Sequence, residues 1–258
     1  MKDIGDLHFF LGIQVHRTTA SLHLLQLKYI TKLLETTRMV GAKPAKTPIP
    51  AGTKQSQHDG DHLDNATEYR HLVGALQYCV LTRPDIAFSV NQLFQFMHNP
   101  TTIHWAAAKR VLRYLKCTIQ QDLCFSTGSL QLNAYTDSNW AGNPNDRRST
   151  TGYAIFLGPC LISWTIKKQP VMSKSKTKVE YRSLALATSE LFLLRMLFQD
   201  LHIPLTSTPT MWCDNIGAIS LASNLAFHAL TKHVEVDYHF IRDKVVQNDI
   251  IINYLPTA

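Results

Sequence analysis

The sequence predicts an α/β fold, in which the C-terminal half from about residue 121 forms a mixed sheet with the element order β-β-β-α-β-α-α-β. The first supporting observation is the alternation of apolar and polar residues from Leu130 to Tyr135, which is typical of a half-buried strand. The second is a long helical pattern over residues 179–201. The third is the alternation of short strand and helix patterns that continues from there to the end of the chain.

The first segment, residues 1–42, is expected to form a β-hairpin followed by a helix. A strand over 9–15, a polar turn at 18–21 and a strand over 22–24 precede a helical pattern over 26–39. A piece of about 40 residues buries too little surface to fold alone. We therefore expect this segment to pack on the helices that follow it.

The middle of the chain is expected to contain a linker and a small helical connector. Between residues 43 and 66 the apolar pattern disappears among prolines, glycines and polar residues, as in a linker or surface loop. The connector, residues 67–120, shows three helical patterns, and Pro84 is tolerated in the first turn of the second. These patterns cover residues 68–81, 84–97 and 101–116.

The C-terminal half, residues 121–258, begins with three short strands that suggest an antiparallel meander. A long helix, a fourth strand, two further helices and a last strand follow. In chain order, the expected elements are strands 130–136, 152–157 and 161–166, helix 179–201, strand 210–213, helices 215–224 and 233–247, and strand 250–255.

Composition and charge favour a soluble, intracellular protein that binds a polyanion. Hydrophobic residues make up 45% of the chain, and the formal net charge is +7, which suits nucleic acid or an anionic membrane surface. No apolar run approaches the roughly 18 residues that span a bilayer, and the N-terminus lacks the apolar core of a signal peptide. The five cysteines include no C-x-x-C pair, so we expect reduced thiols.

Three carboxylates, Asp137, Glu180 and Asp214, are expected at the ends of regular elements, where such ends can converge on one rim of a sheet. Phosphodiester hydrolysis is served by two Mg²⁺ ions roughly 3.5 to 4 Å apart. Because Mg²⁺ prefers hard oxygen ligands, such a site is built from Asp and Glu. The sequence therefore predicts these three residues as the catalytic and metal-binding group.

Each of these carboxylates also has a structural interpretation. Asp137 and Asp214 are residues of the type that caps turns and helices, and Asp214 directly precedes a predicted helix. Glu180 has the spacing from Thr177 that closes a capping box. Taken singly, each structural role is favoured; the order Asp, Glu, Asp at three element ends favours the metal site.

Several motifs resemble the ribonuclease H region of copia-type retrotransposon polyproteins. They are AYTDSNWAG at 134–142, DRRSTTGY at 146–153, EYRSLA at 180–185 and CDN at 213–215. Upstream, YRHLVG at 69–74, TRPDI at 82–86 and AKRVLRYLK at 108–116 extend the similarity, and MKDIGDL at 1–7 with FLGI at 10–13 resembles the part of reverse transcriptase after its catalytic strand. The resemblance covers the whole chain apart from the linker.

The resemblance implies a reverse-transcriptase remnant at 1–42 and a ribonuclease H-like domain at 121–258. It implies an endoribonuclease that hydrolyses the RNA strand of RNA/DNA hybrids with two Mg²⁺ ions, held by Asp137, Glu180 and Asp214, within a larger polyprotein. The family's Tyr-x-Asp-Asp polymerase motif is absent from the sequence, so we expect no DNA synthesis. The family's fourth carboxylate lies in a segment that would follow Ala258, so we expect a domain truncated there and weak cleavage by this chain alone.

Substrate contacts are expected beside these carboxylates. Five lysines before and at the start of the long helix are candidates for binding hybrid phosphates, although a solvated loop explains each of them equally well: Lys167, Lys168, Lys174, Lys176 and Lys178. Ser138, Asn139 and Asn215 are candidates for contacting the ribose 2′-OH that distinguishes RNA from DNA.

Two alternatives remain open. Where the family usually has Ser-Ser-Thr-Glu-Ala-Glu-Tyr, this chain has SKTKVEY at 175–181, and such departures favour a catalytically impaired or inactive remnant that keeps only the fold and nucleic-acid binding. An integrase-type nuclease shares the layer architecture. Its carboxylates run Asp, Asp, Glu along the chain, which differs from the order found here.

Overall fold

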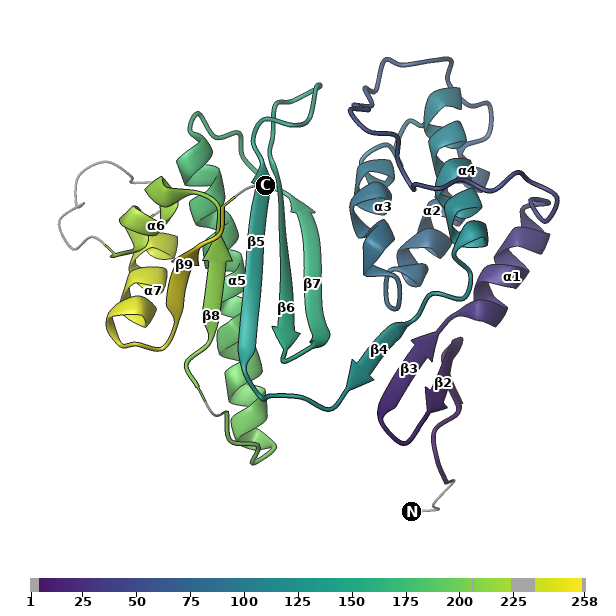
Figure 1. Cartoon of the computed structure of the whole chain (residues 1–258). Helices are drawn as coiled ribbons and strands as arrows, with labels where there is room; N and C mark the ends of the chain where they lie inside the picture. The colour runs from purple at the N-terminus through teal and green to yellow at the C-terminus, as the bar shows by residue number, and fades with distance from the viewer. Residues whose placement is uncertain (1–4, 206, 224–234, 257–258) are drawn as a thin grey trace. The chain divides into compact units, whose positions relative to one another are not determined.

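The computed structural model describes residues 5–205, 207–223 and 235–256. The chain divides into two compact units, Met1–Ser126 and Thr127–Ala258, called here the N-terminal and C-terminal units. Figure 1 shows helices and a small sheet in the first unit, and a larger sheet with helices in the second. The division predicted from the sequence into segments 1–42, 43–66, 67–120 and 121–258 stays a prediction.

The N-terminal unit contains an antiparallel sheet with the strand order β1-β2-β3-β4. The strands are β1 Phe9–Phe10, β2 Ile13–Arg17, β3 Ser21–Leu25 and β4 Leu123–Ser126. The single strand predicted over 9–15 was wrong, because Leu11 and Gly12 have positive φ (46° and 78°) and turn the chain between β1 and β2. Strand β4 was not predicted; it pairs with β3, and His23 Nδ1 lies 2.6 Å from Asp122 Oδ2 beside the pair.

The helices of the N-terminal unit begin and end close to the predicted positions. They are α1 Leu27–Thr36, α2 Ala66–Cys79, the 3-10 helix η1 Pro84–Ile86, α3 Ala87–Phe94 and α4 Thr102–Cys117. The single helix predicted over 84–97 was wrong in its first turn, which is 3-10, and in its end at Phe94. The buried Arg83 fixes this turn, since it donates to both carboxylate oxygens of Asp85 (2.9 and 2.7 Å) and to the carbonyl of Thr118 (2.9 Å).

In the described part of segment 1–42, helix α1 packs on the other helices of the same unit, as expected from the sequence. Ile30 and Leu34 of α1 are buried in one core with side chains of α2, α3 and α4, among them Tyr69, Leu76 and Leu112. Residues 43–65 contain no helix and only one isolated bridge residue, and Arg113 of α4 holds them by donating to the Lys43 carbonyl (2.6 Å). This segment is therefore attached along its length to the helical core.

The C-terminal unit has the predicted element order β-β-β-α-β-α-α-β, which confirms a mixed α/β architecture. Its sheet has the order β7-β6-β5-β8-β9, in which β7, β6 and β5 are antiparallel and β5, β8 and β9 are parallel. The elements are β5 Leu132–Asn139, β6 Thr150–Leu157, β7 Cys160–Lys168, α5 Lys176–Asp200, β8 Thr210–Cys213, α6 Ile216–Ser223, α7 Glu235–Val246 and β9 Ile251–Tyr254. The first residues predicted for the helix 233–247 lie outside the described residues.

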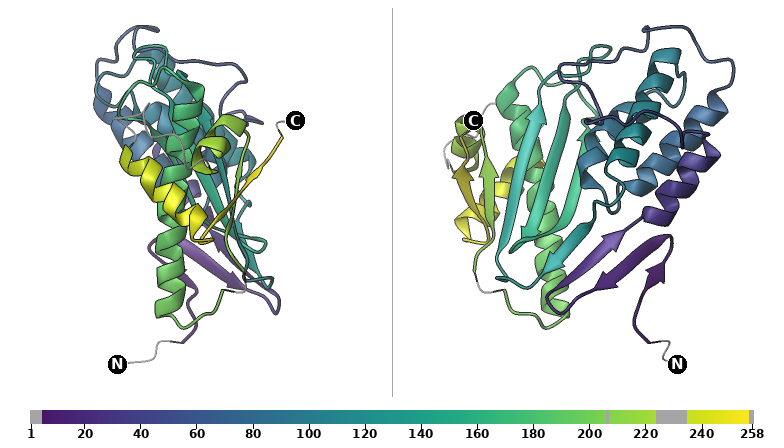
Figure 2. Two further views of the ribbon diagram at one scale, coloured as in Figure 1. Left: turned by 90° about the vertical axis from the view of Figure 1, so that its left-hand side faces the viewer. Right: turned by 45° about the vertical axis from the view of Figure 1, so that its right-hand side comes forward.

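The core of the C-terminal unit lies on one face of this sheet. Ala134 of β5 is in register with Ile155 of β6 and Met211 of β8, so the three side chains share that face. All three are buried in one cluster with side chains of α5, α6 and α7, and Figure 2 shows these helices beside the sheet. At the β6–β7 turn, Gly158 has a φ of 55°, and a Cβ there would collide with the Ser129 carbonyl oxygen.

Within the described ranges, no helix combines the length and the apolar character needed to cross a membrane.

The packing of α1 predicts a position-specific loss of stability in the N-terminal unit. Ile30→Ala should lower the free energy of opening of α2 and α4 by about 2 to 5 kcal/mol, because Ile30 is 1% exposed and its removal leaves a cavity. Leu27→Ala on the same helix should cost less than about 1 kcal/mol, because Leu27 is 37% exposed. Amide hydrogen exchange of α2 and α4 measures both values, and equal effects of the two variants would contradict the packing described.

Candidate metal centre

The three predicted carboxylates come from elements that meet at one edge of the C-terminal sheet. Asp137 lies near the end of β5, and Asp214 directly follows β8. Because β5 and β8 are parallel neighbours, with Tyr135 opposite Trp212, their C-terminal ends lie at the same edge. Glu180 lies in the second turn of α5, which packs on β5.

Helix α5 is attached to β5 beside these carboxylates by short polar contacts. The Ser183 hydroxyl donates to the carbonyl of Asp137 (3.3 Å) and to that of Gly152 (3.2 Å). The Ser138 hydroxyl donates to the Val179 carbonyl (3.4 Å). These contacts fix the position of the α5 turn that carries Glu180 relative to Asp137 in β5.

Glu180 and Asp214 converge. A carboxylate oxygen of each, together with the sulfur of Cys213, forms a group whose atoms all lie within 4.8 Å of one another. Asp137 is exposed at the edge of this group, and its charge acts on Glu180 strongly enough to raise the pKa of that residue. The structure therefore brings Glu180 and Asp214 together, with Asp137 near enough for its charge to act on Glu180.

The environment of Glu180 strongly disfavours an uncompensated negative charge. The side chain is fully buried, and neither carboxylate oxygen has a hydrogen-bond partner among the described residues. Burial, followed by the charges of Asp214 and Asp137, raises the pKa of Glu180 to about 8. Lys176 and the Ser138 backbone, which lies nearby without hydrogen-bond geometry, lower it by less.

The structural interpretations of these carboxylates were wrong. Helix α5 begins at Lys176 instead of residue 179, so Thr177 lies inside the helix and closes no capping box with Glu180. Asn215, and not Asp214, caps α6, because its Oδ1 accepts from the Ala218 N–H (2.9 Å). Asp137 lies within β5, in register with Gly152 of β6, and so is not at a turn.

Cys213 was not among the predicted site residues. Its sulfur belongs to the group with Glu180 and Asp214, but burial raises the pKa of the thiol to about 11, so the thiolate is scarce at neutral pH. A single cysteine beside an aspartate carries no recognisable spacing. No signal in the sequence separates it from the other four cysteines.

The donor set fits a hard divalent cation. Carboxylate oxygens from Asp137, Glu180 and Asp214 are the ligands that Mg²⁺ prefers, whereas the neutral thiol of Cys213 is soft and suits it poorly. A cation also supplies the missing partner of the buried Glu180 oxygens. Such an ion favours the ionised form of each of the three carboxylates, which otherwise disfavour one another's charge.

The predicted substrate-contact residues differ in how they are placed. Ser138 is buried and its hydroxyl contacts Thr151 and Val179, whereas Asn139 is exposed. The Oδ1 atom of Asn215 is used as the cap of α6. For these residues, contact with a ribose 2′-OH stays a prediction.

The predicted lysines likewise fall into two groups. The Lys168 ammonium pairs with Asp146 (2.7 Å), and the Lys176 ammonium lies 3.9 Å from Asp214 Oδ2. Lys167 and Lys174 are exposed and Lys178 is half-buried, and none of these three pairs with a described carboxylate.

Comparison of sequences identifies long relatives that the chain matches over a part of their length. It is 45% identical over all 258 of its residues to the retrovirus-related Pol polyprotein from transposon RE2 of Arabidopsis thaliana, and spans 18% of that protein. It is 37% identical over 254 residues to the corresponding polyprotein from transposon TNT 1-94 of Nicotiana tabacum, and spans 19% of it. An uncharacterized mitochondrial protein of Arabidopsis thaliana is 46% identical over 192 residues, which cover 74% of this chain and 80% of that protein. No family model matches the chain.

Comparison of structures gives more distant likenesses. A foamy viral protease-reverse transcriptase in complex with an RNA/DNA hybrid matches with a TM-score of 0.48 and 10% identity, over 96% of this chain and 29% of that one. LC11-RNase H1 in complex with an RNA/DNA hybrid matches with a TM-score of 0.37 and 12% identity, over 49% of this chain and 86% of that one. Because both TM-scores lie below 0.5, neither likeness establishes a shared fold.

The raised pKa of Glu180 predicts how stability changes with pH when no divalent cation is present. The folded state holds the Glu180 proton more tightly than the unfolded state, so this stabilisation is complete below the ordinary value of 4.5 and is lost as pH rises towards about 8. The slope should approach about 1.4 kcal/mol per pH unit at its steepest. Thermal unfolding in a chelator between pH 5 and 8.5 should show this decline.

Glu180→Gln is the matched control, because it keeps the size of the side chain and cannot ionise. Its stability should lack the decline attributed to Glu180, and Mg²⁺ should flatten the curve of the unmodified chain by favouring the ionised carboxylate. Parallel curves for the unmodified chain and Glu180→Gln would show that Glu180 does not titrate in this range.

Proposed function

This chain belongs to the copia-type retrotransposon Pol polyproteins, and from that premise we propose that its C-terminal unit hydrolyses the RNA strand of RNA/DNA hybrids as a ribonuclease H-like domain. Asp137, Glu180 and Asp214 are proposed to hold the Mg²⁺ ions. The observation that carries the proposal is the buried pair of Glu180 oxygens, which lack a partner among the described residues and lie beside two further carboxylates. An integrase-type order of carboxylates does not fit this chain.

The proposed roles follow from how each carboxylate is held. Bound Mg²⁺ supplies an activated water and neutralises the charge that develops on the phosphoryl group. Glu180 is held inside the unit by α5 and is the buried carboxylate of the proposed centre. Asp137 is exposed at the end of β5, where it can meet substrate, and Asp214 is held opposite Glu180 by the end of β8 and the capped start of α6.

The proposed substrate is supported by charge and by the resemblance of the motifs. Lys174 lies just before α5, and Lys176 and Lys178 lie in its first turn, which precedes Glu180. A helix N-terminus with lysines around it attracts phosphate through its free N–H groups and its dipole. The net charge of +7 acts in the same direction. The rest of a Pol polyprotein is the proposed partner.

A specific contact favours the second candidate function, a remnant that binds nucleic acid with little or no turnover. Lys176 stands where the family pattern has serine, and its ammonium lies 3.9 Å from Asp214 Oδ2. A cation fixed beside a metal-binding carboxylate competes with the metal, because both positive charges repel at short distance. Lys176 is therefore expected to weaken Mg²⁺ binding and to slow cleavage.

A cleavage assay with three proteins separates the two functions. The unmodified chain should cleave the RNA strand of a labelled hybrid slowly in Mg²⁺, and Asp137→Asn should lower the rate by about 100-fold or more, because a charged ligand is lost. Lys176→Ser should lower the Mg²⁺ concentration needed for half-maximal rate several-fold. Lys46→Ser, a loss of charge in the N-terminal unit, is the control and should change neither value.

The outcomes decide between the candidates. Cleavage that survives Asp137→Asn would show that the activity does not come from this centre. Hybrid binding without cleavage, in both the unmodified chain and Lys176→Ser, would establish the non-catalytic remnant instead.

A further inference from the structure

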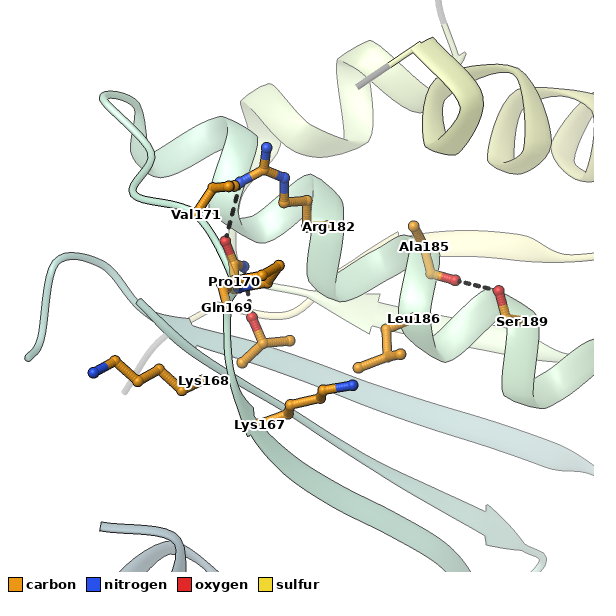
Figure 3. Close-up of a pocket in the computed structure, with 10 residues that line it drawn as sticks. Lys167, Lys168, Gln169, Pro170, Val171, Arg182, Ala185, Leu186 and Ser189 are labelled. Atoms are coloured by element: carbon orange, nitrogen blue, oxygen red, sulfur yellow. Dashed lines mark hydrogen bonds between the residues drawn. The ribbon is translucent and has the colours of Figure 1, made fainter. Parts of the chain in front are cut away.

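A hollow of about 430 Å³ lies between the edge strand β7 and helix α5 of the C-terminal unit. Figure 3 shows side chains from the end of β7, the segment after it and the outer side of α5 around this space. None of the three metal-centre carboxylates lines it. The lining residues are Thr151, Lys167, Lys168, Gln169, Pro170, Val171, Arg182, Ala185, Leu186 and Ser189.

The hollow carries positive charge that the described part of the chain does not neutralise. Lys168 points away from Lys167 in Figure 3, and its ammonium is paired with Asp146 at 2.7 Å. No described carboxylate forms an ion pair with Lys167 or Arg182. The guanidinium of Arg182 donates only a long hydrogen bond, 3.4 Å from Nη1 to the neutral Oε1 of Gln169. Among the described residues that line the hollow, Lys167 and Arg182 are therefore the cations without an ion pair, and Figure 3 shows their charged ends on different sides of it.

The remaining lining favours an anion that is attached to a less polar body. The Ser189 hydroxyl donates to the Ala185 carbonyl within α5, so its oxygen can accept from a sugar hydroxyl and does not bind the anion itself, while Pro170 and Leu186 provide apolar surface. A phosphate ester combines these features, because its charge suits Lys and Arg and its sugar packs on apolar side chains. A planar guanidinium can bind two phosphate oxygens at once.

Gln169 connects this hollow to the metal centre. It is buried, and its Nε2 donates to Thr151 Oγ1 (2.7 Å) and to the carbonyl of Val179 (3.2 Å), the residue before Glu180. The Ser138 hydroxyl, beside Asp137, lies 3.2 Å from the same Thr151 hydroxyl. A series of hydrogen bonds through Gln169, Thr151 and Ser138 thus connects Arg182 to the backbone next to Glu180 and Asp137.

We propose, on the basis of the function proposed above, that this hollow is a second nucleic-acid contact that binds a backbone phosphate of the hybrid away from the cleaved bond. The Arg182 guanidinium binds the phosphate, and Gln169 is a positioning residue that orients this guanidinium. Lys167 attracts the same strand electrostatically from another side of the hollow. Lys168, which was grouped with Lys167 in the sequence, is neutralised by Asp146 and has no direct part. This contact fixes where the strand lies relative to the metal centre.

The test is hybrid binding measured by fluorescence anisotropy over a range of salt concentrations. All proteins carry Asp137→Asn, so binding is measured without cleavage and does not depend on whether the chain is active. Each phosphate contact contributes about 0.9 to the slope of log affinity against log salt. Lys167→Gln and Arg182→Gln should each reduce this slope by roughly 0.9 and weaken binding several-fold at about 100 mM salt.

Matched controls separate a pocket contact from loss of charge or loss of fold. Arg182→Lys keeps the charge and should keep the slope, with weaker binding because the fork is lost. Lys46→Gln, exposed in the N-terminal unit, should leave the slope unchanged. Unaltered thermal midpoints show that the variants are folded.

Three results would overturn the inference. The first is a slope that does not change in Lys167→Gln and Arg182→Gln, and the second is an equal fall of the slope in Lys46→Gln. The third is displacement of hybrid from the Asp137→Asn chain by adenosine monophosphate, at millimolar concentration and constant ionic strength, without any change of slope. That result would make the hollow a site for a small nucleotide. If the slope effect is absent while the unmodified chain cleaves hybrid, only this contact is removed. If the unmodified chain does not cleave but the slope effect is present, only the catalytic proposal is removed.

Discussion

The burial of Glu180 is the constraint on which the C-terminal site depends. A carboxylate taken out of water without a donor is costly to ionise, and two neighbouring aspartates increase that cost. The fold nevertheless holds it in place, through the serine contacts between α5 and β5 and the apolar packing of the same helix. In the folded chain a proton or a cation can offset this cost, and a divalent cation offsets it for all three carboxylates together. The proposed catalytic function rests on this need for a cation beside the buried carboxylates.

The topology of the sheet explains why these residues meet. The switch from antiparallel pairing on one side of β5 to parallel pairing on the other places the ends of β5 and β8 side by side. Helix α5, which makes the crossover between β7 and β8, then passes over the same strands and delivers Glu180 to their shared edge. The hydrogen-bonded layer of Ser138, Thr151 and Gln169 extends from this edge to the hollow beside β7. The proposed metal centre and the proposed phosphate contact thus rest on one hydrogen-bonded part of the unit.

Periodicity in the sequence was sufficient to predict the element order of the C-terminal unit, because its strands and helices are long enough to show a pattern. It failed where structure depends on distant partners or on one turn inside an apolar run. Strand β4 is four residues long and is stabilised by pairing with β3, about a hundred residues earlier in the chain. The turn at Leu11 and Gly12 interrupts an apolar run that reads as one strand. At the site, the carboxylates were predicted by their positions and motifs, whereas Cys213 and Arg182 became apparent only from their three-dimensional neighbours.

The central claim, that Glu180 is a buried ligand awaiting a divalent cation, is tested most directly by the protons released when Mg²⁺ binds. Isothermal titration calorimetry at pH 7, in two buffers of different ionisation enthalpy, counts them. Because the pKa of Glu180 is about 8, the side chain is mostly protonated at this pH, and close to one proton should leave for each chain that binds metal. Glu180→Gln should bind more weakly and release none. Mg²⁺ binding with no proton released, or with equal affinity in Glu180→Gln, would contradict the account.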